Sequence, residues 1–339
     1  MSNARNLSKL LGTDTQITTP DIADGVFQAN KNLIINGAMT VAQRGTSFTS
    51  TADSYTLDRF ALGHGSPVNA CTTEQSTDAP DNFKYSMKVT AGTGASAGTT
   101  GYASLRQAIE GQNIAHVNFG TSSAKNITLS FWVKCSLTGN FGTNIRNQAG
   151  NRAYASIYTI NSANTWEYKT VTIPADTGGT WPTDSGIGFH IQWDLGAGSN
   201  YDIAAGSWTN GTNMFGVEGT VKLTETTNAT WQITGVQLEV GEQATPFEHR
   251  SYGDELAACQ RYYQRSQTYH YIPRGYAAEG YLNLLFPVEM RANPTLTTTV
   301  SAAVTGNSIS AVSTGIRGYI QSNWTNSPAL NNWQVDAEL

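Results

Sequence analysis

The feature that most constrains this chain is an alternation of apolar and polar residues with a period of two. In the stretch "ITLSFWVKC", every second side chain is apolar, namely Ile127, Leu129, Phe131, Val133 and Cys135. Such alternation places the apolar side chains on one face of a β-strand, and it is typical of antiparallel sheets with one buried and one solvated face. We therefore expect rows of large apolar side chains to be buried between facing sheets.

The same alternation recurs in "FKYSMKV", residues 83–89, and in "GFHIQWDL", residues 188–195. In the second stretch the apolar set should face the core, namely Phe189, Ile191, Trp193 and Leu195. The polar set should face solvent, namely His190, Gln192 and Asp194. Roughly ten such strands are separated by turns rich in Gly, Asn, Ser and Thr, which is typical of a sandwich or barrel. The predicted fold class is all-β, with an antiparallel β-sandwich or barrel, then a short helix and a smaller C-terminal β module.

The chain of 339 residues is predicted to divide into four segments. Residues 1–30 form an N-terminal segment, whose short helix should dock on another surface, and a linker, and residues 31–248 form the β-sandwich. Residues 249–266 form a connecting helix, and residues 267–339 form the small C-terminal β module. A module of about seventy residues is hard to stabilise alone, which makes contact with other copies attractive.

Two local signals surround the predicted helix. In "WQITGVQLEV", residues 231–240, the apolar phase slips by one residue at Thr234 and Gly235, and a β-bulge at the glycine would restore it. Ser251 followed by Asp254 resembles a capping box that opens a helix. On that helix one narrow, mainly apolar stripe consists of Leu256, Cys259 and Tyr263. Such a stripe can pack under a domain or around a symmetry axis.

Several functional classes receive little support from the residues. The formal charge is −5 and no run of Lys or Arg occurs, so a nucleic-acid partner is not expected. "GASAG" contains Ser96 in a nucleophile-elbow pattern, but it lies in a Gly/Thr loop without the strand and helix that this motif needs. The five histidines lack zinc-site spacing, and no pair of carboxylates identifies a glycosidase. The three cysteines are expected to be small buried side chains, Cys71, Cys135 and Cys259.

The aromatic residues carry the main hypothesis of ligand binding. Trp193 and Trp231 keep the apolar phase of their strands and are expected in the core. Aromatic rings in loops rich in Gly and Asn can stack on sugars while neighbouring Asn and Asp side chains bind hydroxyl groups, although loop tryptophans also commonly cover the end of a core. Trp132 points opposite to Phe131 and suggests a subunit contact. The candidate glycan-binding residues are Trp181, Tyr201, Trp208, Trp324 and Trp333.

Four stretches resemble the framework of bacteriophage tail-fibre and virion-surface structural proteins. They are "NLIINGAMTVAQRGTSF" (32–48), "YTLDRFAL" (55–62), "ITLSFWVKCS" (127–136) and "WQITGVQLEVGEQATPFEHRSYGDELAACQRYYQ" (231–264). The resemblance implies a galactose-binding-like jelly roll related to carbohydrate-binding modules, in a homotrimeric fibre or spike. The family often has Trp after Asp-Arg, where this chain has Phe60, and a core role survives that exchange. Residues after 264 lie outside the resemblance, as expected for a tip that varies with the host.

The resemblance also implies a structural calcium near the first and last strands of the jelly roll. On that analogy the ligands would be Asn36, Asp58 and Glu239, since calcium takes several oxygen ligands. The alternative for Glu239 is a salt bridge with Arg44 or Arg59.

The expected function is a non-enzymatic fibre or spike on the virion surface, most fittingly a tail fibre, that attaches to host-surface glycans. The expected partners are its own copies in a homotrimer through Leu256, Cys259 and Tyr263, and other virion proteins through residues 1–30. No nucleic acid, membrane insertion or signal peptide is expected, so the protein would be made in the host cytoplasm. The alternatives are an architectural head or neck fibre or a capsid decoration protein without a specific ligand, a glycan depolymerase, and a cellular carbohydrate-binding module.

Overall fold

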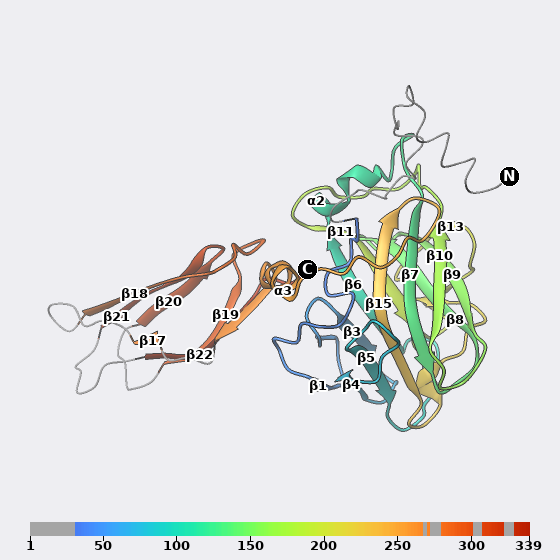
Figure 1. Ribbon diagram of the computed structural model, residues 1–339, viewed down its shortest axis with the longest axis horizontal. Helices are drawn as coiled ribbons and strands as arrows, with labels where there is room; N and C mark the ends of the chain where they lie inside the picture. The colour runs from blue at the N-terminus through green and yellow to red at the C-terminus, as the bar shows by residue number, and fades with distance from the viewer. Residues whose placement is uncertain (1–30, 267–269, 272–278, 301–306, 322–328) are drawn as a thin grey trace, which may run out of the picture.

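The computed structural model describes residues 31–266, 270–271, 279–300, 307–321 and 329–339. The predicted attachment segment, residues 1–30, lies outside the described residues. Within these ranges the chain forms a large β-sandwich, one helix of nine residues and a smaller β module (Figure 1). No helix in these ranges has the length and apolar character that crossing a membrane requires.

Two antiparallel sheets build the sandwich, which confirms the predicted fold class. The six-stranded sheet has the order β1 (Ser47–Ser50), β4 (Cys71–Ser76), β5 (Ser86–Ala91), β15 (Thr230–Val240), β7 (Ile127–Cys135) and β10 (Glu167–Ile173). The seven-stranded sheet has the order β13 (Trp208–Asn210), β9 (Arg152–Ile160), β8 (Gly139–Asn147), β11 (Ile187–Asp194), β6 (Tyr102–Glu110), β3 (Ala61–Gly65) and β2 (Ser54–Tyr55). Shorter elements in the connections are α2 (Gly111–Ile114), η2 (Ala115–Val117), η3 (Leu223–Glu225) and the parallel pair β12 (Asp202–Ile203) and β14 (Gly216–Val217).

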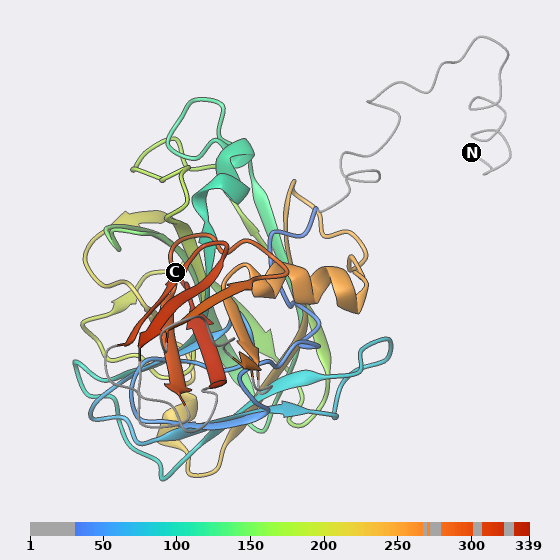
Figure 2. The ribbon, with the colours of Figure 1, turned by 90° about the vertical axis from the view of Figure 1, so that its left-hand side faces the viewer.

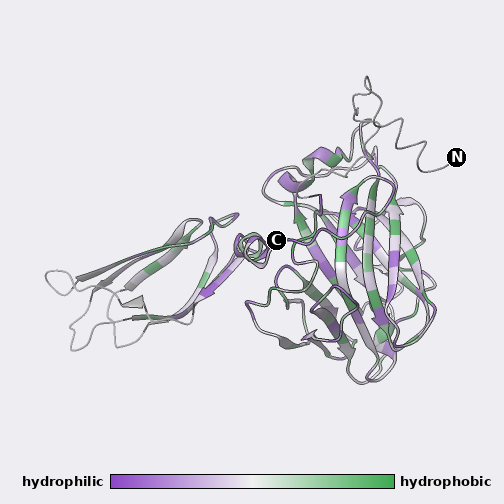
Figure 3. Cartoon of the chain, in the orientation of Figure 1, coloured by the Kyte–Doolittle hydropathy of each residue, from purple (hydrophilic) through white to green (hydrophobic). Residues whose placement is uncertain are grey.

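The inward rows predicted from the alternation fill the space between the sheets. On β7 all five predicted inward residues are buried, and Figure 3 shows hydrophobic and hydrophilic residues alternating along the strands of the sandwich. Trp193 of one sheet and Trp231 of the other are fully buried, with ring centroids 6.4 Å apart. The three cysteines are free and buried, as expected. Burial of these rows is the main source of stability, since apolar burial contributes about 25 cal/mol per Å².

The prediction of a solvated outer face on β11 is wrong. His190, Gln192 and Asp194 are all buried, because the segment after β11 folds back over this face of the seven-stranded sheet. Asp194 accepts hydrogen bonds from the Val217 amide at 3.0 Å and from Lys222 Nζ at 2.7 Å, which fastens that segment to the sheet. Alternation records which side chains face the core, but it does not reveal a loop that covers the opposite face.

The phase slip in β15 is confirmed as a bulge. The register with β7 shifts between Thr234 and Gln237, and Gly235 has a φ of +61°. A side chain at Gly235 would meet Phe83 at 2.7 Å and Trp132 at 3.1 Å. The bulge therefore needs a glycine for both its backbone angle and its close contacts.

The stretch 32–39 forms no strand, although its sequence predicts one with Leu33 and Ile35 on a shared face. It follows β15 irregularly: backbone hydrogen bonds join Leu33 to Leu238 at 2.8 Å and Val236 to Gly37 at 3.0 Å, and between them Asn32 Nδ2 donates to the Val236 carbonyl at 3.1 Å. Leu33 and Ile34 are buried instead. Asn36 has a positive φ of 62°, a conformation that asparagine tolerates better than most residues.

Helix α3 (Tyr252–Gln260) is shorter than the predicted segment 249–266. Its N-cap is Ser251, whose Oγ accepts from the Asp254 amide at 3.2 Å, as the capping signal predicts. After the helix, residues 263–266 form strand β16 (Tyr263–Ser266), which pairs with β22 (Ala329–Asp336) of the C-terminal module. Figure 1 shows the helix between the sandwich and this module, and in the view of Figure 2 the module, in red, lies in front of the sandwich.

The C-terminal module contains two small sheets with a core of their own. β22 pairs with β16, β17 (His270–Tyr271) and β19 (Thr295–Val300), while β21 (Gly315–Gln321) pairs with β18 (Glu279–Leu285) and β20 (Asn307–Val312). The buried side chains include Leu282, Met290, Ile316, Leu330 and Val335. The module is thus a second hydrophobic cluster, separate from that of the sandwich.

We predict that Gly235→Ala destabilises the protein more than Gly219→Ala does. Both glycines have a positive φ, which costs a non-glycine residue about 1–2 kcal/mol, but a side chain at Gly219 meets nothing within 4 Å. Gly235→Ala must also displace Phe83 and Trp132, so its cost in the free energy of unfolding should be larger by about 1 kcal/mol or more. Urea denaturation of both variants measures the difference, and equal losses would show that the bulge has room for a side chain.

Candidate functional site

A groove of about 670 Å³ lies on the outer face of the six-stranded sheet, over the bulge in β15. Its floor and walls come from β7, β10 and β15 and from two loop segments, residues 81–83 and 244–249. Most of its exposed lining is apolar, and the described residues that form it are Asp81, Asn82, Phe83, Ser130, Trp132, Tyr168, Gly235, Ala244, Thr245, Pro246, Phe247 and His249.

One wall of the groove is a pair of aromatic side chains. Trp132 on β7 lies directly opposite Tyr168 on β10 in the strand register, and their ring centroids are 5.4 Å apart. Trp132 points outwards because its neighbours on the strand, Phe131 and Val133, point into the core. Tyr168 is 44% exposed, so the pair offers ring surface to a ligand.

The opposite wall is a second aromatic group. Phe83 lies 5.1 Å from Phe247 and 5.4 Å from His249, measured between ring centroids. The alternation of "FKYSMKV" predicts Phe83 on the same inward face as Met87, but β5 begins only at Ser86, and Phe83 packs in the groove instead. Gly235 allows this ring to approach β15 closely.

Polar groups lie among these rings. Asp81, Asn82, Ser130 and Thr245 contribute carboxylate, amide and hydroxyl groups to the lining. Flat aromatic surfaces with scattered hydrogen-bonding groups can bind ring-shaped ligands that have both apolar and polar faces. The alternation predicts the outward direction of Trp132, which suggests a subunit contact, but it gives no sign of Tyr168, whose position depends on the pairing of β7 with β10.

The predicted sugar-binding aromatics do not form one site. Trp181 is buried, and its Nε1 donates to Asp176 Oδ2 and to the Gly178 carbonyl, both at 3.0 Å. Trp208 is half-buried, packs 5.6 Å from Trp181 and donates to the Pro174 carbonyl at 3.1 Å. These contacts account for both rings as a cover over the end of the core, which is the alternative that the sequence left open.

The other three predicted aromatics are dispersed. Tyr201 is half-buried beside Tyr102 and Phe215, with ring centroids 5.7 Å and 4.9 Å away. Trp333 is buried in the core of the C-terminal module. Trp324 lies outside the described residues.

The three predicted calcium ligands already have protein partners. Asn36 Nδ2 donates to the Val41 and Asp58 carbonyls, and Asp58 accepts from the Gln43 amide and side chain. Glu239 accepts from Gln237 and Thr245 instead of Arg44 or Arg59. In the part of the chain that the structure describes, no three His, Cys, Asp or Glu side chains are grouped in a way that could hold a metal ion. The residues therefore do not fit the predicted calcium site.

The predicted threefold contact of the helix is also replaced by contacts within one chain. Cys259 and Tyr263 are buried, and Leu256 is half-buried. Tyr263 donates to Gln334 Oε1 at 2.9 Å, and the guanidinium of Arg44 lies 3.6 Å from its ring centroid. The stripe therefore packs under a domain, the first of the two alternatives that the sequence allowed.

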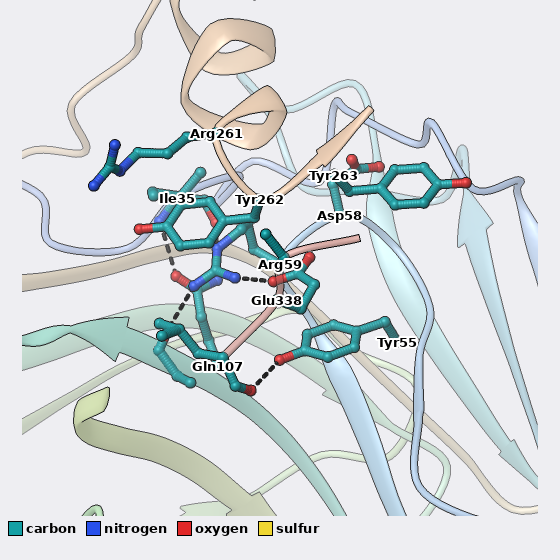
Figure 4. Close-up of polar contacts among 12 residues, drawn as sticks. Ile35, Tyr55, Asp58, Arg59, Gln107, Arg261, Tyr262, Tyr263 and Glu338 are labelled. Carbon is teal, nitrogen blue, oxygen red and sulfur yellow. Dashed lines mark hydrogen bonds and ion pairs between the residues drawn. The ribbon is translucent and has the colours of Figure 1, made fainter. Parts of the chain in front are cut away.

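A buried arginine fixes this junction between the sandwich and the C-terminal module (Figure 4). The Arg59 side chain is 1% exposed, forms an ion pair with Glu338, and donates to the Ala108 carbonyl. Its guanidinium lies 3.5 Å from the ring centroid of Tyr262. Burial, the largest single effect, lowers the pKa of Arg59, but the Glu338 carboxylate together with Tyr262, Tyr55 and Cys259 more than offsets it and raises the pKa, so the charge is retained.

Further polar contacts surround Arg59. Glu110, at the end of β6, accepts from Arg261 Nη2 at 2.7 Å and from the Tyr262 hydroxyl at 2.8 Å. Burial is the main reason that the pKa of Tyr262 rises to about 12, so its hydroxyl stays protonated and remains a donor. Tyr55 donates to the Leu339 carbonyl at 2.7 Å. The residues after β22 are therefore held on the sandwich by hydrogen bonds and ion pairs.

The linker before the helix is attached in the same way. Arg250 donates to the Asn32 and Ile34 carbonyls, and the Asn32 amide donates to Glu248 Oε2 at 2.9 Å. These residues belong to the stretches that carry the family resemblance. Those stretches therefore form both the core and the junction.

We predict that Arg59→Met costs about 3 kcal/mol of unfolding free energy, the lower end of the range for a broken buried ion pair, because the Glu338 carboxylate loses this partner and keeps Arg44 at 3.1 Å. The double variant Arg59→Met with Glu338→Gln should lose less than the single variant. Lys88→Met is the matched control, since it breaks the pair with Glu74 whose side chains are 29% and 38% exposed, and it should cost below about 1 kcal/mol. Urea denaturation measures all three, and a loss for Arg59→Met no larger than for Lys88→Met would contradict a buried junction.

Comparison with known proteins gives matches at the level of the fold only. No protein-family model and no curated protein matches the chain. Among solved structures, the enzymatically active domain of tailspike protein 4 of bacteriophage CBA120 matches with 15% identity and a TM-score of 0.34, over 62% of this chain and 22% of that chain. A family 4 carbohydrate-binding module matches with 14% identity and a TM-score of 0.32, over 61% of this chain and 98% of that chain. The xylan-binding domain of a Paenibacillus barcinonensis protein matches with 9% identity and a TM-score of 0.30, over 64% of this chain and 99% of that chain. At such TM-scores the neighbours carry no argument about function.

Proposed function

We propose that this protein is a non-enzymatic surface protein of a bacteriophage virion, most fittingly a tail fibre, and that its jelly roll attaches to host glycans. The observation that carries the proposal is the outward pair of Trp132 and Tyr168 on the wall of an open groove. Exposed aromatic pairs on a sheet face are costly to leave in water, so a ligand that covers them gains apolar contact.

A glycan fits the chemistry of the groove. Sugar rings have an apolar face that can stack on Trp132 and Tyr168, and their hydroxyl groups can bond to the exposed side chains of Asp81 and Asn82. A single site of this kind binds weakly. Several copies on one particle would raise the effective concentration, so weak sites suffice for adhesion.

The lining favours binding over hydrolysis. Asp81 is the single carboxylate among the described residues that line the groove. A glycosidase of the common type places two carboxyl groups about 5–9.5 Å apart across the scissile bond. The groove does not offer that pair, which supports an adhesive role over a depolymerase.

The rest of the chain has proposed roles in the particle. Residues 1–30 attach the protein to other virion proteins, and the protein functions at the virion surface after synthesis in the host cytoplasm. The resemblance in residues 32–264 supports this assignment. The second candidate is an architectural head or neck fibre or a decoration protein, and the buried junction at Arg59 favours it, because a firm connection between two domains suits a structural part.

We predict that Trp132→Ala and Tyr168→Ala each reduce adsorption of the labelled protein to host cells by about tenfold, which corresponds to about 1.4 kcal/mol and is the scale of the apolar contact of one large side chain. Tyr281→Ala is the control, because Tyr281 is 65% exposed on the C-terminal module. A parent protein that does not adsorb would support the architectural candidate. Equal adsorption of the parent and both groove variants would exclude this groove as the adhesive site.

We also propose that the protein is a homotrimer, whose copies multiply weak glycan contacts. Cys259 and Tyr263 are buried within one chain, so the trimer contact must use other residues. Native mass spectrometry at micromolar concentration should give three times the mass of 36.4 kDa. A single-chain mass under these conditions would remove multivalency from the proposal.

A further inference from the structure

A second polar cluster lies on the outer face of the seven-stranded sheet, the opposite side of the sandwich from the groove. On three neighbouring strands, Arg146 of β8 is opposite His190 of β11, and Gln192 of β11 is opposite Arg106 of β6. Ile191 between the two β11 residues is in the core, so these side chains all point outwards. We call Arg106, Arg146, His190 and Gln192 the cationic cluster.

The positive charge of this cluster is only partly compensated. Arg106 Nη2 lies 2.8 Å from Asp53 Oδ2 and is paired. Arg146 is 9% exposed, and among the described residues no carboxylate lies within 4.0 Å of its guanidinium. A buried charge without a partner is strongly disfavoured, so its presence suggests a ligand of opposite charge.

His190 lies beside the unpaired guanidinium and is itself incompletely bonded. It is 7% exposed, and its Nδ1 is buried without a hydrogen-bond partner in the described part of the chain. Burial, together with Arg146 and Arg106, holds the pKa of His190 well below its ordinary value. Burial and then Arg106 also lower the pKa of Arg146 to about 10. An anion at this position would relieve the charge repulsion that adds to the effect of burial in both shifts.

Aromatic side chains adjoin the cluster. The Arg146 guanidinium lies 5.1 Å from the ring centroid of Phe215, and Phe215 packs against Tyr102 and Tyr201. Tyr102 also donates to Asp53 Oδ1 at 3.1 Å, which connects the aromatic group to Arg106. All three rings are half-buried. Rings and a guanidinium at one place can bind a sugar that has both a ring face and a charge.

Neutral side chains hold this arrangement in place. Gln192 Nε2 donates to Asn144 Oδ1 at 2.5 Å and to the Met214 carbonyl at 3.0 Å, which leaves its Oε1 to accept from Arg146 Nε at 3.5 Å. Asn144 Nδ2 donates to the Phe215 carbonyl at 2.8 Å. The same amides therefore orient the guanidinium and the aromatic loop before any ligand arrives, which lowers the entropy cost of binding.

We propose that the cationic cluster binds the carboxylate of an acidic sugar residue through Arg146, while Tyr102, Tyr201 and Phe215 contact the sugar ring. Arg is suited to this task because its planar fork can donate two parallel hydrogen bonds to a carboxylate. The choice of a sugar as the carrier of the carboxylate rests on the proposed glycan adhesion. The site is separate from the groove, so the two can be tested independently.

The test is isothermal titration calorimetry of the full chain with trigalacturonate, its methyl ester and sodium sulfate. Trigalacturonate should bind, and the methyl ester, which lacks the charge, should bind about tenfold more weakly. Arg146→Gln should weaken trigalacturonate binding by about tenfold, and Arg146→Lys should give an intermediate loss because it keeps the charge without the fork. Arg317→Gln, an equal change of charge at an exposed position, should have no effect.

Thermal unfolding separates a binding role from a structural role. If Arg146 had a structural role, its replacement would lower the melting temperature. Because Arg146→Gln removes a buried charge that has no carboxylate partner, the melting temperature should instead stay unchanged or rise. A lower melting temperature would overturn the proposal.

Three titration results would also overturn it: equal binding of the ester and the acid, sulfate binding as tight as trigalacturonate binding, or full affinity in Arg146→Gln. Trp132→Ala should not change trigalacturonate affinity, so failure of the groove and failure of the cationic cluster can be told apart.

Discussion

The ion pair of Arg59 with Glu338, under the ring of Tyr262, is the contact on which the arrangement of the two β domains depends. It joins the sandwich, the segment after α3 and the residues after β22 at one buried point. A buried pair of charges is not a strong source of stability in itself, because both ions lose their hydration. Its contribution here is to the specificity of the junction, since displacement of the module would leave Arg59 buried in the sandwich without its partner Glu338. The hydrogen-bonded pairing of β16 with β22 then connects this junction to the rest of the C-terminal module.

Much of the fold follows from local periodicity. The inward residues of β7 and β11, the bulge at Gly235 and the cap at Ser251 were all predictable, because each depends on side chains close in sequence. The burial of His190 and Asp194 was not predictable, because it depends on a later loop that returns over the sheet. The irregular path of residues 32–39 likewise depends on Asn32 and its bonds to β15.

The candidate site was harder to predict than the fold. Trp181 and Trp208 lie in loops whose composition suggests exposure, yet they pack together over the end of the core. The groove instead uses Trp132 and Tyr168, which become neighbours only when β10 pairs with β7 in one particular register. The pairing of Arg146 with His190 also depends on register. A single sequence gives the face on which a side chain lies, but it does not give its neighbour on the next strand.

The position of β22 has a consequence for how proteins with this architecture can diversify. β19 and β22 are adjacent antiparallel strands in which Val300 pairs with Leu330, so the chain leaves this sheet after β19 and returns to it at β22. Exchange of the sequence between these two strands would keep the contacts of Arg59 and also those of Arg291, which donates to the Ser185 and Ala337 carbonyls. Recombination there would replace part of the C-terminal module with an unrelated sequence while the junction with the sandwich stays the same.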